Sequence, residues 1–260
     1  MKPYLLFVRA GKSLPLCLLD YQSDPEIELV VSEYEAPSYI LPGNPIIQSG
    51  GKSKFDAARI FFESQPEYLN VKIAAFFDPD LEISFWKIKE LFHYGVECGS
   101  ALYQAALTSD SYGSWPHVFQ RSEQKYRKTT FVEVMAPFMD RKLLRSVWPY
   151  FSDSISTWGQ EYIWYSKAKR RKIHVIDLIA MKHVSPIDIE NGAFYKYLRS
   201  MLIDPWQEKK NLRRIYCDRF YLETDCPHYA PFFLIPEWLI FKVISHRAKT
   251  ILMKLTKKLT

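Results

Sequence analysis

Cysteine is scarce in this chain of 260 residues, and no two of its four cysteines have the spacing of a metal-binding or redox pair. We interpret all four as reduced thiols of a reducing compartment, with a disulfide between Cys217 and Cys226 as the less favoured alternative. No apolar run is long enough to cross a membrane, and Arg9 interrupts the short run at the N-terminus, which therefore does not resemble a signal peptide. We expect a cytoplasmic protein.

The chain also lacks a strong excess of either charge. Lysine and arginine total 35 against 29 acidic residues, and the net charge of +6 suits phosphates, nucleotides or an anionic membrane surface as partners. The basic residues do not alternate with stacking aromatics, so we expect no nucleic-acid binding. Hydrophobic residues make up 48% of the chain, which excludes a disordered protein and allows one large domain.

Segments with the periodicity of strands and helices alternate along the first 203 residues. We predict strands at 4–11, 26–35, 72–77, 129–139 and 172–184, and helices at 54–68, 82–95, 141–151 and 158–168. The strand at 72–77 is apolar on both faces, which is typical of a central strand of a parallel sheet. Gly95 is expected to cap the second helix, and Asp140 the start of the third. The order predicts an α/β fold with a mostly parallel central sheet flanked by helices.

A change in composition near residue 204 divides the chain. We predict that residues 1–203 form the domain that carries the functional site and that 204–260 form a C-terminal extension. At 237–260, apolar residues fall on one helical stripe and basic residues largely elsewhere, which is the pattern of a helix lying in a membrane plane. Such a helix could bind an anionic membrane, giving a peripheral position at its inner face, or pack on the protein's own core.

Two carboxylates follow the apolar strand directly, in the sequence Phe77-Asp78-Pro79-Asp80. Ligands of open α/β sheets bind outside the carboxyl ends of the strands, where unpaired buried carboxylates would be costly. A divalent cation with a diphosphate would satisfy both, because Mg²⁺ takes one or two protein carboxylates and completes its shell with phosphate and water oxygens. The competing interpretation is structural: Asp78 begins a turn and Asp80 caps the following helix.

Four blocks of the chain resemble known proteins in the same order. Residues 51–83, "GKSKFDAARIFFESQPEYLNVKIAAFFDPDLEI", resemble the segment of GT-A-type glycosyltransferases that leads into their Asp-x-Asp motif, and more closely the family called domain of unknown function 707. The later blocks are QAAL (104–107), FVEVMAPFMDRKLLRSVWPYF (131–151) and WGQEYIWYSKAKRRKIHVIDLIAMKHV (158–184). The resemblance covers about residues 45 to 186 and departs from that family's motif at Phe77 and Pro79. It implies a GT-A-like fold.

The resemblance also implies roles for charged residues. Asp78 and Asp80 would hold Mn²⁺ or Mg²⁺, with His183 completing the shell; the alternative for His183 is a structural residue at a strand end. Arg9, Lys54, Arg59 and Asp78 would contact the nucleotide-sugar donor, the basic residues by neutralising its diphosphate. For those basic residues, the alternative is a solvated surface.

Two glutamates are candidate catalytic bases. Glu161, in a Trp-Gly-x-Glu turn at a helix start, would take a proton from the acceptor hydroxyl in an inverting enzyme, or stabilise the helix N-terminus in the structural alternative. Glu133, within the predicted strand 129–139, is the second candidate, and its alternative is a buried pair with Arg141 or Arg145.

The resemblance, together with these residues, implies a metal-dependent glycosyltransferase of the hexosyltransferase type. It would transfer a sugar from a nucleotide diphosphate-sugar to a glycan or lipid-linked acceptor in surface polysaccharide biosynthesis. The stereochemistry stays open. One alternative is a non-catalytic scaffold of the polysaccharide machinery, which would bind no nucleotide. The other is a phosphatase or phosphotransferase with an aspartyl nucleophile, although here the acidic motif follows two earlier strands and precedes Leu81 and Glu82.

Overall fold

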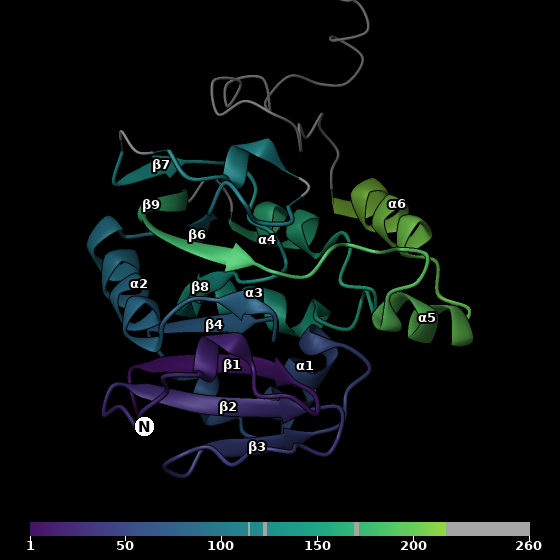
Figure 1. Cartoon of the computed structure of the whole chain (residues 1–260). Coiled ribbons are helices and arrows are strands. Elements are labelled where there is room, and N and C mark those ends of the chain that lie inside the picture. The colour runs from purple at the N-terminus through teal and green to yellow at the C-terminus, as the bar shows by residue number, and fades with distance from the viewer. Residues whose placement is uncertain (114, 122–123, 169–171, 217–260) are drawn as a thin grey trace, which may run out of the picture.

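A computed structural model describes residues 1–113, 115–121, 124–168 and 172–216 of the chain (Figure 1). Its strands are β1 (Tyr4–Ala10), β2 (Ile27–Glu33), β3 (Ile46–Ser49), β4 (Ile73–Phe77), β5 (Leu81–Glu82), β6 (Leu102–Leu107), β7 (Tyr126–Lys128), β8 (Phe138–Asp140) and β9 (Ile173–His183). Its α-helices are α1 (Lys54–Ser64), α2 (Phe85–Cys98), α3 (Arg141–Val147), α4 (Gln160–Ala168), α5 (Ala193–Ser200) and α6 (Pro205–Tyr216).

The strands form one mixed sheet in the order β3-β2-β1-β4-β8-β6-β9-β5, with β7 paired to β9. β3, β2, β1 and β4 are parallel, and the short β8 runs antiparallel to both β4 and β6. Since β6 is parallel to β9, the carboxyl ends of β1, β4, β6 and β9 lie at the same edge of the sheet. In Figure 1, α5 and α6 lie on the side to which the arrows of β1 and β9 point.

The structure confirms most of the strands and helices that hydrophobic periodicity or a capping residue predicted. β1, β2, β4 and β9 match the predicted strands, and every residue of β4 is buried. α1, α3 and α4 match predicted helices, and the Asp140 carboxylate caps α3 by accepting a hydrogen bond from the Leu143 amide at 2.9 Å. Residues 36–53, between a predicted strand and a predicted helix, contain the additional strand β3, which adds a parallel edge beside β2.

The strand predicted at 129–139 is wrong over most of its length. Only β8, at its C-terminal end, is a strand, and residues 131–137 form a loop that contains Glu133. The carbonyl oxygens of Val134 and Met135 accept hydrogen bonds from the Lys54 ammonium group. Pro137 has no amide hydrogen to donate to a neighbouring strand. The carbonyl oxygens of Pro137 and Met135 accept hydrogen bonds from the Phe76 and Asp78 amides at 3.1 and 3.0 Å, so both the backbone of β4 and the Lys54 side chain hold this loop.

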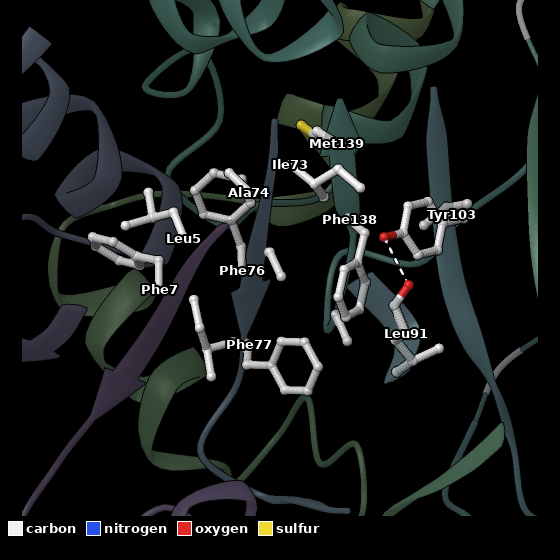
Figure 2. Close-up of a cluster of buried hydrophobic side chains, with 14 of the residues drawn as sticks. Leu5, Phe7, Ile73, Ala74, Phe76, Phe77, Leu91, Tyr103, Phe138 and Met139 are labelled. Atoms are coloured by element: carbon white, nitrogen blue, oxygen red, sulfur yellow. Dashed lines mark hydrogen bonds between the residues drawn. The ribbon is translucent and has the colours of Figure 1, made fainter. Parts of the chain in front are cut away.

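The cap predicted at Gly95 is also wrong, because α2 continues to Cys98 and ends at Gly99 in the left-handed conformation, with φ of 60°. Gly95 lies inside the helix, where the Tyr103 ring covers it. The Tyr103 hydroxyl donates to the Leu91 carbonyl at 3.0 Å, as Figure 2 shows. A Cβ atom at Gly95 would lie 2.1 Å from the Tyr103 hydroxyl oxygen, so this glycine serves packing.

The core at the centre of the sheet is largely aromatic. Phe76 packs toward α1 and its neighbours, with ring centroids 5.7 Å from Phe55 and 5.4 Å from Phe151. On β8, Phe138 contacts Phe77 at 5.6 Å and stacks on Tyr103 at 4.8 Å (Figure 2). This packing fixes β4, and with it the position of the carboxylates that follow Phe77.

The described part of the predicted extension lies against the domain. α6 contacts α4, and Glu208 of α6 accepts hydrogen bonds from the segment at 154–156. The predicted helix at 237–260 and both Cys217 and Cys226 lie outside the described residues. None of the helices in the described ranges is long and apolar enough to span a bilayer.

We predict that Gly95→Ala destabilises the protein although alanine favours helices. The gain of about 1 kcal/mol in helix propensity is outweighed by overpacking against Tyr103, and the free energy of unfolding should fall by about 2 kcal/mol in urea denaturation. Glu97→Ala, at an exposed position of the same helix, is the control and should change it by less than about 0.5 kcal/mol. Equal stability of the two variants would contradict the packing role of Gly95.

Candidate functional site

Lys54 is a buried cation at the first residue of α1. Ser53 caps this helix, and only 4% of Lys54 is exposed, so the interpretation of a solvated helix face is wrong for this residue. The ammonium nitrogen lies 2.6 Å and 2.9 Å from the carbonyl oxygens of Val134 and Met135 and 2.8 Å from Oδ1 of Asp78. Burial lowers the pKa of Lys54, and the charge of Asp78 opposes that shift. The lysine joins α1, the 131–137 loop and the end of β4.

Asp80 lies beside His183, although 103 positions separate the two in the chain. β5 pairs antiparallel with the end of β9, which aligns Leu81 with His183 and brings Asp80 Oδ2 to 3.2 Å from His183 Nε2. Burial would lower the pKa of His183, but the hydrogen bond with Asp80 and its charge raise it to about 8. Burial raises the pKa of Asp80, but the hydrogen bond with His183 and its charge outweigh burial, so the pKa of Asp80 is lowered on balance.

Asp80 does not cap a helix. α2 begins five residues later at Phe85, and the Phe85 amide donates to the carboxylate of Asp20 at 2.8 Å. Residues 79–80 do form a turn, which leads into β5. The helix-cap part of the structural interpretation is therefore wrong, whereas its turn is present. The carboxylate of Asp80 is directed to His183 instead.

The side chains at this edge suit a divalent metal ion. The Nδ1–H of His183 donates to the Tyr112 carbonyl oxygen at 2.6 Å, and its Nε2–H donates to Asp80 when the ring is protonated. Loss of the Nε2 proton would turn this nitrogen into a metal ligand, and a carbonyl that binds the other ring nitrogen is usual for metal-binding histidines. No cluster of three or more His, Cys, Asp or Glu forms a metal site among the described residues. Asp80 and His183 would supply two ligands to such an ion, beside Asp78, whose Oδ1 atom is paired with Lys54.

Glu133 is a buried acid in the loop between β7 and β8. Its amide donates to Oε1 of Gln104 at 2.6 Å, whereas its own Oε2 atom is buried without a hydrogen-bond partner among the described residues. Burial raises the pKa of Glu133 to about 8. The predicted pairing with Arg141 or Arg145 is wrong, because these two bind the carbonyl of residue 71 and the side chain of residue 70 instead.

Glu161 lies in the first turn of α4, and its Oε2 atom accepts a hydrogen bond from the Gly159 amide at 3.1 Å. Burial raises the pKa of Glu161 to about 7, although the positive charge of Lys209 opposes the shift. The positive charge of His183 lowers the pKa of Glu133, whereas the negative charge of Glu161 raises it. The two candidate bases therefore belong to the same electrostatic environment as the Asp80–His183 pair.

The two arginines proposed as diphosphate ligands are held by other acceptors. Arg9 donates to the Ser32 hydroxyl and to the carbonyl oxygens of Gly50 and Gly51, at 2.8 to 3.0 Å. Its role in the structure is to fasten the glycine loop that leads into α1. Arg59 contacts residues 56, 63 and 152, none of which belongs to the group around Asp78.

Sequence reasoning missed two residues that the structure adds to this region. Gln104 is part of the QAAL block but received no role, and it holds the loop of Glu133 through the amide contact described above. Lys209, on α6, is half-buried near Glu161, and its ammonium lies 5.1 Å from the centre of the Trp115 ring. No local pattern in the sequence indicates that α6 folds back onto α4.

The fold is similar to solved structures of S. aureus TarS. The structure of TarS 1-349 in complex with UDP-GlcNAc has a TM-score of 0.50 and 14% identity, over 84% of this chain and 71% of that chain. The same fragment in a second structure gives 0.49 and 13% over 83% and 72%, and A197 from STIV gives 0.43 and 16% over 71% and 86%. Searches of family models and of curated proteins found no match. The likeness confirms the predicted GT-A-like α/β fold.

We predict that stability falls with rising pH because of the two buried glutamates. Each has a folded-state pKa above its ordinary value, so the folded protein binds more protons than the unfolded chain between about pH 4.5 and pH 8, and the free energy of unfolding decreases across that window. Glu133→Gln and Glu161→Gln remove this loss, so thermal unfolding should show them stabilised relative to wild type at about pH 9 and much less at about pH 5.

The control for this measurement is Glu97→Gln, which changes an exposed glutamate of α2 and should follow the wild-type profile at both pH values. If the buried variants ran parallel to the wild type from acid to alkaline pH, neither carboxyl would have the raised pKa described above.

Proposed function

We propose that the protein is a metal-dependent glycosyltransferase that moves a sugar from a nucleotide diphosphate-sugar to a glycan or lipid-linked acceptor in surface polysaccharide biosynthesis. The observation that carries this proposal is the meeting of Lys54, Asp78, Asp80 and His183 at the carboxyl edge of the sheet. Open α/β sheets bind ligands at that edge. The likeness to TarS, which was solved with UDP-GlcNAc, supports a nucleotide-sugar as the ligand.

The residues at the edge divide into two pairs with different tasks. Asp80 and His183, with Asp78, would hold Mn²⁺ or Mg²⁺, which when bound supplies positive charge to the leaving diphosphate. Lys54 is too enclosed by its two carbonyl acceptors to swing out toward a ligand. Burial raises the pKa of Asp78, and the charge of Lys54, 2.8 Å away, opposes that shift and adds to the positive potential at the end of β4.

Glu161 fits the role of general base better than Glu133. A base must be deprotonated near neutral pH, and a pKa of about 7 leaves about half of the Glu161 population ionised there. With a pKa of about 8, Glu133 is mostly neutral at pH 7 and can donate a hydrogen bond instead. If the enzyme retains configuration, no such base is needed and Glu161 binds the acceptor.

The finer assignments rest on the sequence. Membership of the family called domain of unknown function 707, the catalytic domain at 1–203 and a membrane-binding helix at 237–260 remain predictions of this proposal. A lipid-linked acceptor would agree with a peripheral position at a membrane, which liposome binding of the full chain would test.

We predict that the purified protein releases a nucleoside diphosphate from one member of a panel of UDP-, GDP-, CDP- and ADP-sugars. Removal of divalent metal with EDTA should abolish the release, and Asp80→Asn should lower it by about 100-fold, because the charge on the leaving group is then poorly neutralised. Asp24→Asn, at a partly buried carboxylate that is paired with Lys89 instead of with His183, is the control and should leave turnover unchanged. Metal-independent turnover at the wild-type rate in Asp80→Asn would contradict the proposal.

We also predict the pH dependence of kcat/KM. With Glu161 as the base, kcat/KM should rise as the pH increases through about 7, and Glu161→Gln should reduce it by about 100-fold or more and remove this inflection. Glu133→Gln should keep the inflection. The opposite pattern, with an inflection near 8 that only Glu133→Gln removes, would assign the base to Glu133 instead.

A further inference from the structure

The segment that leads into α4 has positive φ angles on both sides of Trp158, and the one at Thr157 is strained. Thr157 has φ of 69° and Gly159 has φ of 90°. A positive φ is common for glycine but unusual for a β-branched residue such as threonine. Gly159 also faces a close neighbour, because a Cβ atom there would lie 3.1 Å from the Cα atom of Lys209. Trp158 is therefore held in one place by backbone geometry that the chain adopts at a cost.

Glu208 on α6 offsets that cost. Its carboxylate accepts hydrogen bonds from the Ser154 hydroxyl at 2.9 Å and from the amides of Ile155 and Ser156 at 3.1 and 2.8 Å. Strained backbone persists where the surroundings over-determine it, and such places cluster at binding sites. The Glu208 carboxylate, which accepts three hydrogen bonds from residues 154–156, fixes the backbone before Thr157 in this way. The outlier at Thr157 therefore points to a function for the residue next to it.

Trp158 forms an aromatic corner with Tyr195 of α5 and Trp206 of α6. The Trp158 ring centre lies 4.8 Å from Trp206 and 6.2 Å from Tyr195, and both neighbours stand at 84° to it. Trp206 is 59% exposed and Trp158 is partly exposed, so the corner is accessible and is not part of the core. In a perpendicular pair the edge of one ring contacts one face of the other, so the opposite face stays open to a ligand, and the Trp158 side chain hydrogen-bonds to the Tyr195 hydroxyl.

The aromatic corner is continuous with the carboxylate edge. Trp158 precedes Glu161 by three residues and is joined to it by Gly159, whose amide binds the Glu161 carboxylate. Tyr195 is close enough to Asp78 that the aspartate charge adds to the effect of burial in raising the tyrosine pKa. α5 and α6 both lie beyond the carboxyl ends of β1 and β9 in Figure 1.

We propose that the aromatic corner of Trp158, Tyr195 and Trp206 binds a saccharide ring of the acceptor and orients its hydroxyl toward Glu161. A pyranose ring has flat C–H faces that pack on aromatic rings and hydroxyls at its rim that bind N–H and O–H groups, which matches this combination of surfaces. The inference rests on the proposed function and adds that the acceptor is a sugar at its reacting end, whether the glycan is free or lipid-linked.

The test is calorimetry of the full chain against maltohexaose, cellohexaose and N-acetylchitohexaose, with UDP and Mn²⁺ present. We expect one of these hexasaccharides to bind the wild type, and Trp206→Ala to weaken that binding by roughly 2- to 12-fold, the value of one aromatic contact. Trp86→Ala is the matched control, since Trp86 is 55% exposed on α2 and should leave the affinity unchanged. Tyr195→Phe is a second, conservative variant that should weaken binding by removing one hydroxyl.

Absence of binding of all three hexasaccharides to the wild type would overturn the inference, as would equal affinities of Trp206→Ala and Trp86→Ala. Calorimetry with UDP alone separates this inference from the proposed function, because Trp206→Ala should bind UDP as the wild type does. UDP binding without saccharide binding would reject the saccharide-binding role of the aromatic corner and leave the proposed transferase function standing. Saccharide binding that depends on Trp206 without any nucleotide binding would remove the transferase and leave a saccharide-binding site.

Discussion

The buried ammonium group of Lys54 is the interaction on which the rest of the site depends. A lysine taken out of water is costly unless every lost hydrogen bond is replaced, and here two carbonyl oxygens and the carboxylate of Asp78 replace them. The same contacts fix residues 134 and 135 beside the end of β4, where the Met135 carbonyl oxygen also accepts a hydrogen bond from the Asp78 amide. The loop then passes the end of β4, which brings Glu133 to the edge where the carboxylates lie.

The other constraint is the pairing of β5 with the end of β9. The two residues of β5 pair with the end of β9, with Leu81 opposite His183, and this pairing places Asp80 beside His183. After β9 the polypeptide continues directly to α5 and α6. The strand that supplies the histidine therefore also leads to the helices that carry Tyr195, Trp206 and Lys209. The proposed donor and acceptor regions are in this way joined to one sheet, which would hold the two substrates of a transferase at a fixed separation.

Local sequence signals specified much of this structure but not its long-range contacts. β4 and the carboxylates after it were predictable, because an apolar strand and two adjacent acids are visible in eleven-residue windows. The end of α2 was not, because the neighbour that requires Gly95 is Tyr103 on another element. Arg9 was assigned to a diphosphate on its position at a strand end, yet its acceptors are two glycine carbonyls some 40 residues later. The positions of Trp206 and Lys209 near the site were not predictable from local sequence, because they depend on the packing of α6 on α4.

The most direct test of the central claim is calorimetry of the purified protein against UDP, GDP, CDP and ADP, each with and without Mn²⁺, for the wild type and for His183→Ala. Our account predicts that one diphosphate binds in a metal-dependent manner and that loss of the imidazole beside Asp80 abolishes the metal dependence. Absence of binding of every nucleotide to a folded wild-type protein would contradict it and would favour a scaffold that keeps the fold without the chemistry.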